Sequence, residues 1–225
     1  MQMDVKKTLA DWKKAKPLLL TKTGVSEELR TLLVIDPATP LEIMSVVRHF
    51  NGVKDNLEKI ANSPRLKSEK AARQCLSTIT LRISAHVDWL TGRLTGLNSA
   101  RGTVRSQLDE MVRDGDRFVQ LYQGDKLRIQ DATEFEGSLA TRATTISNAC
   151  LKAGVNQSWR DGFQTFSMGQ RNLLHTQIIP AVRTLARGVN GGPKTLPGLA
   201  KPITSLHDSI KKAPEYLEKP VAFSY

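Results

Sequence analysis

The sequence has few aromatic residues, few cysteines and no long apolar run, and each shortage excludes a class of protein. Aromatic side chains make up only 5% of the chain, so we expect a largely aliphatic core. The two cysteines, Cys75 and Cys150, form neither a CxxC motif nor a disulfide framework. No stretch approaches the roughly 20 apolar residues of a membrane span. Because the first residues do not resemble a secretory signal, the expected location is cytoplasmic.

Proline is absent between Pro64 and Pro180, although the chain contains ten prolines. Within that stretch, apolar residues recur at spacings of three and four, which is the pattern of helices that bury one face. The sequence therefore predicts an all-α fold: a multi-helix bundle of long antiparallel helices with a Pro/Gly-rich C-terminal extension. We expect three regions, namely an N-terminal helical segment over residues 1–38, the bundle core over 39–187, and an extension with one short helix over 188–225.

Capping residues and glycines predict where several helices begin and end. Thr39, Pro40 and Glu42 form a capping box with proline at the first helical position, and this helix should end near Asn62. A long helix is expected over about 68–97, followed by a break at residues 98–102 and another helix over about 104–122. Three further signals are an N-cap at Asp131, a stop at Gly154 and a new start near Asn156.

Proline marks the remaining elements of the chain. Pro180 should either kink the last bundle helix or restart it, because proline lacks the backbone N–H group. Residues 188–202 are rich in glycine and proline and read as a connector. A short helix over 204–212 and an extended tail over 213–225 are expected after it. At the other end of the chain, residues 4–16 are expected to form a helix that docks on the bundle.

The charge is strongly basic overall but unevenly distributed. The formal net charge is +11, from 33 Lys and Arg residues against 22 Asp and Glu residues. Residues 1–97 carry +6, residues 98–141 carry −2 and residues 142–225 carry +7. Two interpretations follow: the cations cover solvated helix faces, or they form a surface for an anionic partner. No more than two basic residues are consecutive, so a disordered basic arm is not indicated.

The spacing of reactive residues does not indicate an active site. The four histidines, at positions 49, 86, 175 and 207, lie far apart, and none is at the helical zinc spacing from another. The glycine-rich residues 188–195 lack a Gly before Lys194, where a phosphate-binding loop needs one. We expect no cofactor, no metal ion and no catalytic residues. An enzyme built from distant residues would need His86 or His175 beside a carboxylate in a deep polar pocket.

Two functions remain as hypotheses. The first is a non-enzymatic structural or interaction protein that assembles through helix faces and terminal segments, with protein partners or with itself as a homo-oligomer. The alternative is a sequence-independent nucleic-acid-binding protein, for packaging or coating, that uses its basic N- and C-terminal regions. The expected anion or nucleic-acid contacts are Lys13, Lys14, Lys16, Lys22, Arg183, Arg187, Lys194, Lys201, Lys211 and Lys212.

Overall fold

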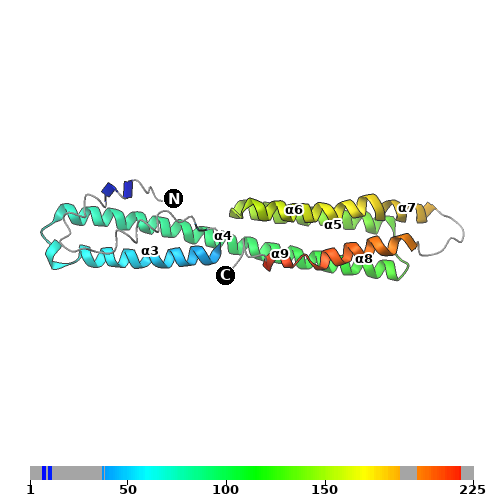
Figure 1. Ribbon diagram of the computed structural model, residues 1–225, viewed down its shortest axis with the longest axis horizontal. Coiled ribbons are helices and arrows are strands. Elements are labelled where there is room, and N and C mark those ends of the chain that lie inside the picture. Colours follow the sequence, from blue (N-terminus) through cyan, green and yellow to red (C-terminus); the bar gives the residue numbers. More distant parts are fainter. Residues whose placement is uncertain (1–6, 9, 12–36, 38, 188–196, 219–225) are drawn as a thin grey trace. The chain divides into compact units, whose positions relative to one another are not determined.

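The computed structural model describes residues 7, 8, 10, 11, 37, 39–187 and 197–218 (Figure 1). The secondary-structure elements within these residues are all helical, which confirms the predicted all-α multi-helix bundle. None of the helices described combines the length and apolarity that a membrane crossing requires. The Pro/Gly-rich connector at residues 188–196 lies outside the described residues, and so does most of the N-terminal helix expected over residues 4–16.

The helices are joined by short turns where the connections are described. In chain order the elements are α3 (Pro40–Ala61), the 3₁₀ turn η2 (Pro64–Leu66), α4 (Lys70–Gln123), α5 (Ile129–Ala153), α6 (Gln157–Leu173), the π-helical turn η3 (Leu174–Ile178), α7 (Ile179–Arg187), α8 (Pro197–Lys211) and α9 (Glu215–Glu218). The chain divides into two compact units between Thr95 and Gly96, within α4.

In the first unit, α3 and the first half of α4 form an antiparallel helical hairpin (Figure 1). The α3 side chains that are buried include Ile43, Phe50 and Leu57, at the spacing of seven that keeps one helix face inward. Phe50 meets His86 of α4, with the ring centroids 5.2 Å apart. The ion pair from Arg82 to Asp11, at 2.6 Å, ties a described part of the N-terminal region to α4.

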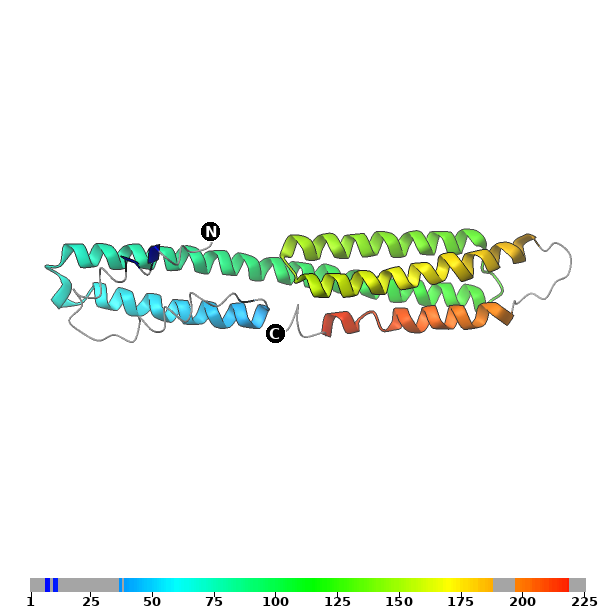
Figure 2. The same ribbon diagram turned by 45° about the horizontal axis from the view of Figure 1, so that its top comes forward.

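The second unit is a bundle in which the second half of α4, α5, the α6–η3–α7 segment and α8 run in alternating directions (Figure 2). Turns of a few residues separate α4 from α5 and α5 from α6, so consecutive helices pack as antiparallel neighbours. The α5 helix packs against α6, η3 and α7, and α8 packs against α6 and η3. Trp159 of α6 donates its indole N–H group to the carbonyl oxygen of Tyr216 in α9, at 3.0 Å.

The predicted break at residues 98–102 is wrong, because α4 continues through it as a single helix of 54 residues. A buried apolar side chain recurs at every seventh position in each half of the helix, so both halves have an apolar face to bury and the pattern shows no gap at the predicted break. Gly102 is tolerated within the helix because a single glycine costs only about 1 kcal/mol against alanine. The recurring residues are Leu76, Ile83, Leu90, Leu97, Val104, Met111 and Phe118.

Two of the predicted helix starts are confirmed, and a third is wrong. At α3, the N–H group of Glu42 donates to the Thr39 hydroxyl at 3.2 Å, and the N–H group of Thr39 donates to the Glu42 carboxylate at 3.1 Å. At α6, Asn156 accepts from the N–H group of Trp159 at 2.8 Å. By contrast, α5 begins at Ile129, and Asp131 is its third residue. Asp131 accepts from the backbone N–H group of Arg128 at 2.8 Å. A carboxylate at the third helical position can bond back to the N-cap N–H group in this way, just as a side chain at the N-cap can bond forward.

The chain stays helical through Pro180, and α7 begins one residue before it. The π-helical turn η3 directly precedes α7, whose second residue is Pro180. A π turn shifts the hydrogen-bond register by one residue, which accommodates a residue without an N–H group. At the end of α5, Gly154 adopts a left-handed conformation with φ 70°, as the predicted stop requires.

The C-terminal helix is longer than expected and belongs to the bundle. It begins at Pro197 instead of near residue 204, so residues 197–202 of the expected connector are helical. Its buried face consists of Leu199, Ile203, Leu206 and Ile210. This apolar stripe repeats at spacings of three and four, and its burial stabilises a helix that its two prolines would otherwise disfavour. Residues 215–218 form α9, where an extended tail was expected.

Candidate functional site

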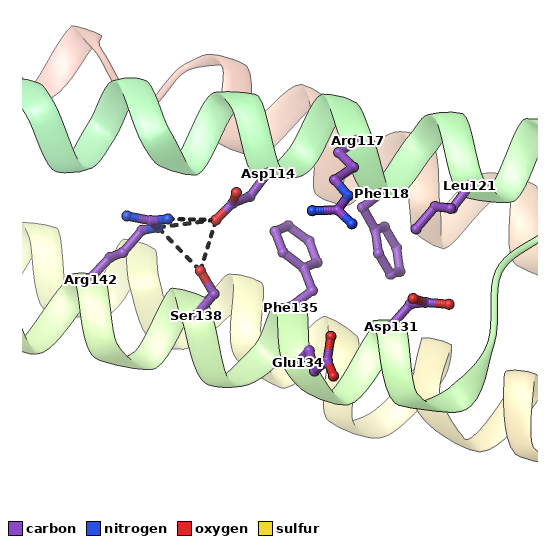
Figure 3. A pocket seen from close by; sticks show the side chains of 9 residues that line it. All are labelled: Asp114, Arg117, Phe118, Leu121, Asp131, Glu134, Phe135, Ser138 and Arg142. Atoms are coloured by element: carbon purple, nitrogen blue, oxygen red, sulfur yellow. Dashed lines mark hydrogen bonds and ion pairs between the residues drawn. The ribbon is translucent and has the colours of Figure 1, made fainter.

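A pocket of about 270 Å³ lies between α4 and α5 in the second unit (Figure 3). Phe118 of α4 and Phe135 of α5 meet there, with their ring planes nearly parallel and centroids 4.7 Å apart. Side chains of both charge signs surround this apolar pair. The residues lining the pocket are Asp114, Arg117, Phe118, Leu121, Asp131, Glu134, Phe135, Ser138 and Arg142.

Arg142 of α5 is the centre of a polar network at one end of this pocket. Its guanidinium group donates to the Asp114 carboxylate at 2.9 and 3.1 Å and also to the carboxylate of Glu110. It contacts Gln107 at 3.4 Å, so three residues of α4 hold one arginine of α5. The Arg142 side chain is 19% exposed, and its burial lowers the pKa of the guanidinium group from the usual value. An arginine remains charged in proteins, and its planar fork suits two carboxylates at once.

Ser138 completes the network, and its surroundings decide what it can do chemically. Its hydroxyl donates to Asp114 at 2.8 Å and accepts from Arg142 at 3.2 Å (Figure 3). A serine nucleophile needs a base that removes its proton, usually a histidine. The pocket lining contains no histidine, and the Asp114 oxygen that holds the hydroxyl proton is itself held by Arg142. The arrangement is therefore suited to cross-linking α4 and α5 and to fixing their register.

A second charged cluster joins α4 to α8. The His207 ring nitrogen lies 2.6 Å from the Asp116 carboxylate, and the Lys211 ammonium group lies 3.4 Å from the same oxygen. The hydrogen bond with His207 is the main cause that lowers the pKa of Asp116, and Lys211 lowers it further. His207 and Lys211 of α8 thus face the acidic side of α4. This pairing fixes α8 beside α4 in the second unit.

The histidines of α4 and η3 occupy different surroundings. His86 is buried between Phe50 and Trp89, with its ring centroid 5.4 Å from that of Trp89, and burial lowers the pKa of its imidazole. His175 lies 3.6 Å from the Glu136 carboxylate, but its side chain is 74% exposed. Neither histidine lines the α4–α5 pocket.

The cations that the sequence singled out are only partly within the described residues. Lys13, Lys14, Lys16, Lys22 and Lys194 lie outside the described residues. Arg187 is the last residue of α7, while Arg183, Lys201 and Lys212 are exposed. Lys211 is paired with Asp116. Lys201 and Lys211 are ten residues apart on α8, or about 15 Å at 1.5 Å per residue. They are therefore too far apart to bind the same phosphate group.

Sequence reasoning missed the Arg142 network, although a signal for it exists. Glu110 and Asp114 are four residues apart, and so are Ser138 and Arg142. Residues four apart share a helix face, so each pair presents two polar groups together. An acidic pair on one predicted helix and an arginine-bearing pair on the next would have indicated a cross-link between neighbouring helices.

The comparisons with known proteins identify no relative. No protein-family model, no curated protein and no solved structure matches this chain. Within the described residues, no three His, Cys, Asp or Glu side chains are grouped so that they could hold a metal ion.

Proposed function

We propose that this chain is a non-enzymatic structural or interaction protein, which assembles with itself or with protein partners through its helix faces and terminal segments. The observation that carries the proposal is the pair Leu41 and Met44, which lie one turn apart on α3 and are 54% and 41% exposed. Residues three apart on a helix are neighbours on its surface, so the two side chains form one small apolar patch.

Exposed apolar side chains on other helices support the same proposal. Leu81 of α4 is 68% exposed, Leu151 of α5 is 60% exposed and Met168 of α6 is 59% exposed. Burying a large apolar side chain contributes about 1.5–3 kcal/mol, which favours a contact that covers several of them. Three polar residues of the α4–α5 pocket, Asp114, Ser138 and Arg142, bond to one another, as expected for a scaffold.

Light scattering coupled to size exclusion tests this proposal. We expect the full chain to elute as a discrete oligomer that nuclease does not change. The double variant L41Q/M44Q should shift it toward lower mass, whereas the control N56Q, at an exposed polar position about three turns further along the same helix, should not. A protein that stays monomeric at every concentration and retains no partner would contradict the proposal.

A second candidate function is sequence-independent nucleic-acid binding. Exposed cations at Arg183, Lys201 and Lys212 favour it, because none of these side chains is paired with another described residue. Contacts to a phosphate backbone need positive charge and no base-reading motif. Binding of a labelled oligonucleotide that weakens steeply with added salt would support this candidate, and no binding at 50 mM salt would remove it.

A further inference from the structure

A groove of about 930 Å³ lies in the first unit, beside the turn that joins α3 to α4. Lys67, Lys70 and Arg73 line it from the turn and from α4, and Glu58 of α3 is the one carboxylate among the described residues of its lining. The three cationic side chains are exposed, and none is paired with another described residue. The described lining therefore carries three cations and one carboxylate, which is a positive excess.

These cations also occupy a position where positive charge is unfavourable for the helix. α4 begins at Lys70, and its first turn contains no acidic residue, although Glu69 directly precedes it. The N-terminus of a helix carries a partial positive charge, which favours an anion nearby and disfavours cations such as Lys70 and Arg73. A bound anion would be attracted by the helix N-terminus and would offset the positive charges of Lys70 and Arg73. A local arrangement that costs stability is typical of a binding site.

The groove continues along α4 as a line of neutral hydrogen-bond donors. Gln74, Ser77 and Thr80 follow Arg73 at spacings of one to three residues, and all of them line the groove. From Lys70 to Thr80 the line is about 15 Å long at 1.5 Å per residue. A single phosphate group would occupy only a fraction of that length, so the groove suits a linear polyanion.

We propose that this groove binds the phosphodiester backbone of a single nucleic-acid strand without reading its sequence. None of the described lining residues is aromatic, so base stacking would not contribute, and the contacts would fall on phosphates. Leu81 is the one large apolar side chain in the described lining, and it is too little to anchor the groove in a membrane. Regularly spaced phosphates match cations three residues apart better than irregular carboxylates of a protein do.

This inference deepens the second candidate function, and it assigns the binding to the first unit instead of to the cations of α7 and α8. The experiment compares two variants of the full chain that lose the same charge. One is K67Q/K70Q/R73Q in the groove, and the other is R183Q/K201Q/K212Q. All six side chains are exposed, and an unchanged helical circular dichroism spectrum would confirm that both variants fold.

Fluorescence anisotropy with a labelled 20-residue oligothymidylate would measure the affinity at several salt concentrations. We expect the groove variant to bind at least tenfold more weakly at 50 mM salt, and the second variant less than threefold. The negative slope of log affinity against log salt should become shallower by about 2 in the groove variant. Each phosphate contact on a single strand contributes about 0.7 to the slope, and the variant loses three cations.

Each alternative has its own result. If the second variant loses affinity and the groove variant does not, nucleic-acid binding stands and the groove assignment is overturned. If the unchanged protein does not bind the oligonucleotide at 50 mM salt, the second candidate function and the groove assignment both fail. Equal competition by poly-glutamate of matched charge would show an acidic-protein site. Binding to phosphatidylserine vesicles but not to the oligonucleotide would show a membrane site, and either result would overturn the proposal.

Discussion

Gly115 of α4 lies against Ile210 of α8, so close that a Cβ atom on residue 115 would stand 3.2 Å from the Cγ2 atom of Ile210. Ile210 is fully buried, and it belongs to the apolar stripe that packs α8 into the bundle. The missing side chain at position 115 therefore allows this close approach, and a larger residue would push α8 away. The same region holds the Asp116 contacts with His207 and Lys211, so apolar packing and charge pairing fix α8 together.

The first prediction concerns this contact. Gly115→Val should lower the free energy of unfolding by about 1–3 kcal/mol, because extra methyl groups in a packed core force neighbours to shift. Gly137→Val is the matched control, since a Cβ atom at Gly137 of α5 would meet nothing within 4 Å. Urea unfolding would measure both. The double variant G115V/I210A should lose less stability than the sum of the two single variants, because the smaller side chain at position 210 makes room for the valine. Purely additive losses would count against a direct clash.

The second prediction tests the Arg142 network. Arg142→Met should lower the free energy of unfolding by about 2 kcal/mol, because it leaves Asp114 without Arg142 and leaves Glu110 with only the longer contact to Arg113, at 3.7 Å. The effect should be smaller than the roughly 3–5 kcal/mol of a fully buried pair, since both carboxylate side chains are 33% exposed. The triple variant R142M/D114N/E110Q removes all three charges and should recover most of the stability. A triple variant as unstable as Arg142→Met would contradict this account.

The third prediction concerns the pH dependence that His86 introduces. Burial lowers the pKa of its imidazole in the folded state, so the unfolded chain binds the proton more tightly. The contribution of His86 to stability is therefore complete above the ordinary histidine pKa of about 6.5 and is lost as the pH falls from there through the folded pKa. His86→Phe retains a ring beside Phe50 and Trp89 but does not titrate. We expect the wild type to lose stability relative to this variant below about pH 6.5 in thermal or urea unfolding, and parallel pH profiles would contradict this.

The fourth prediction concerns Gln170 of α6, which is 2% exposed. Both polar atoms of its amide are buried, with no hydrogen-bond partner among the described residues. A buried polar group without a partner costs about 1–3 kcal/mol, so Gln170→Met should raise the free energy of unfolding by about 1–2 kcal/mol. Gln164→Met, at an exposed position of the same helix, is the control and should change stability by less than about 0.5 kcal/mol. A destabilising Gln170→Met would mean that this amide is bonded in solution.

Helix ends were predictable where a local chemical rule determines them, and less so elsewhere. The capping boxes and stops at Thr39, Gly154 and Asn156 are local, because each satisfies backbone groups within one turn. The expected N-cap at Asp131 is wrong because an aspartate can serve at the cap or three residues into the helix. The expected break near Gly102 is wrong because the seven-residue apolar repeat continues through it without a gap.

The amino-acid sequence by itself determined the helical class of this protein and the chemistry of its helix ends, because periodicity and capping act over a few residues. The tertiary structure decided which distant side chains meet. Arg142 joins Asp114 across 28 residues, and His207 joins Asp116 across 91 residues. Such pairings depend on the order in which helices pack, and that order follows from the fit of whole apolar faces, which no local pattern specifies. The groove lined by Lys67, Lys70 and Arg73 likewise depends on tertiary packing, because residues of both α3 and α4 form its lining.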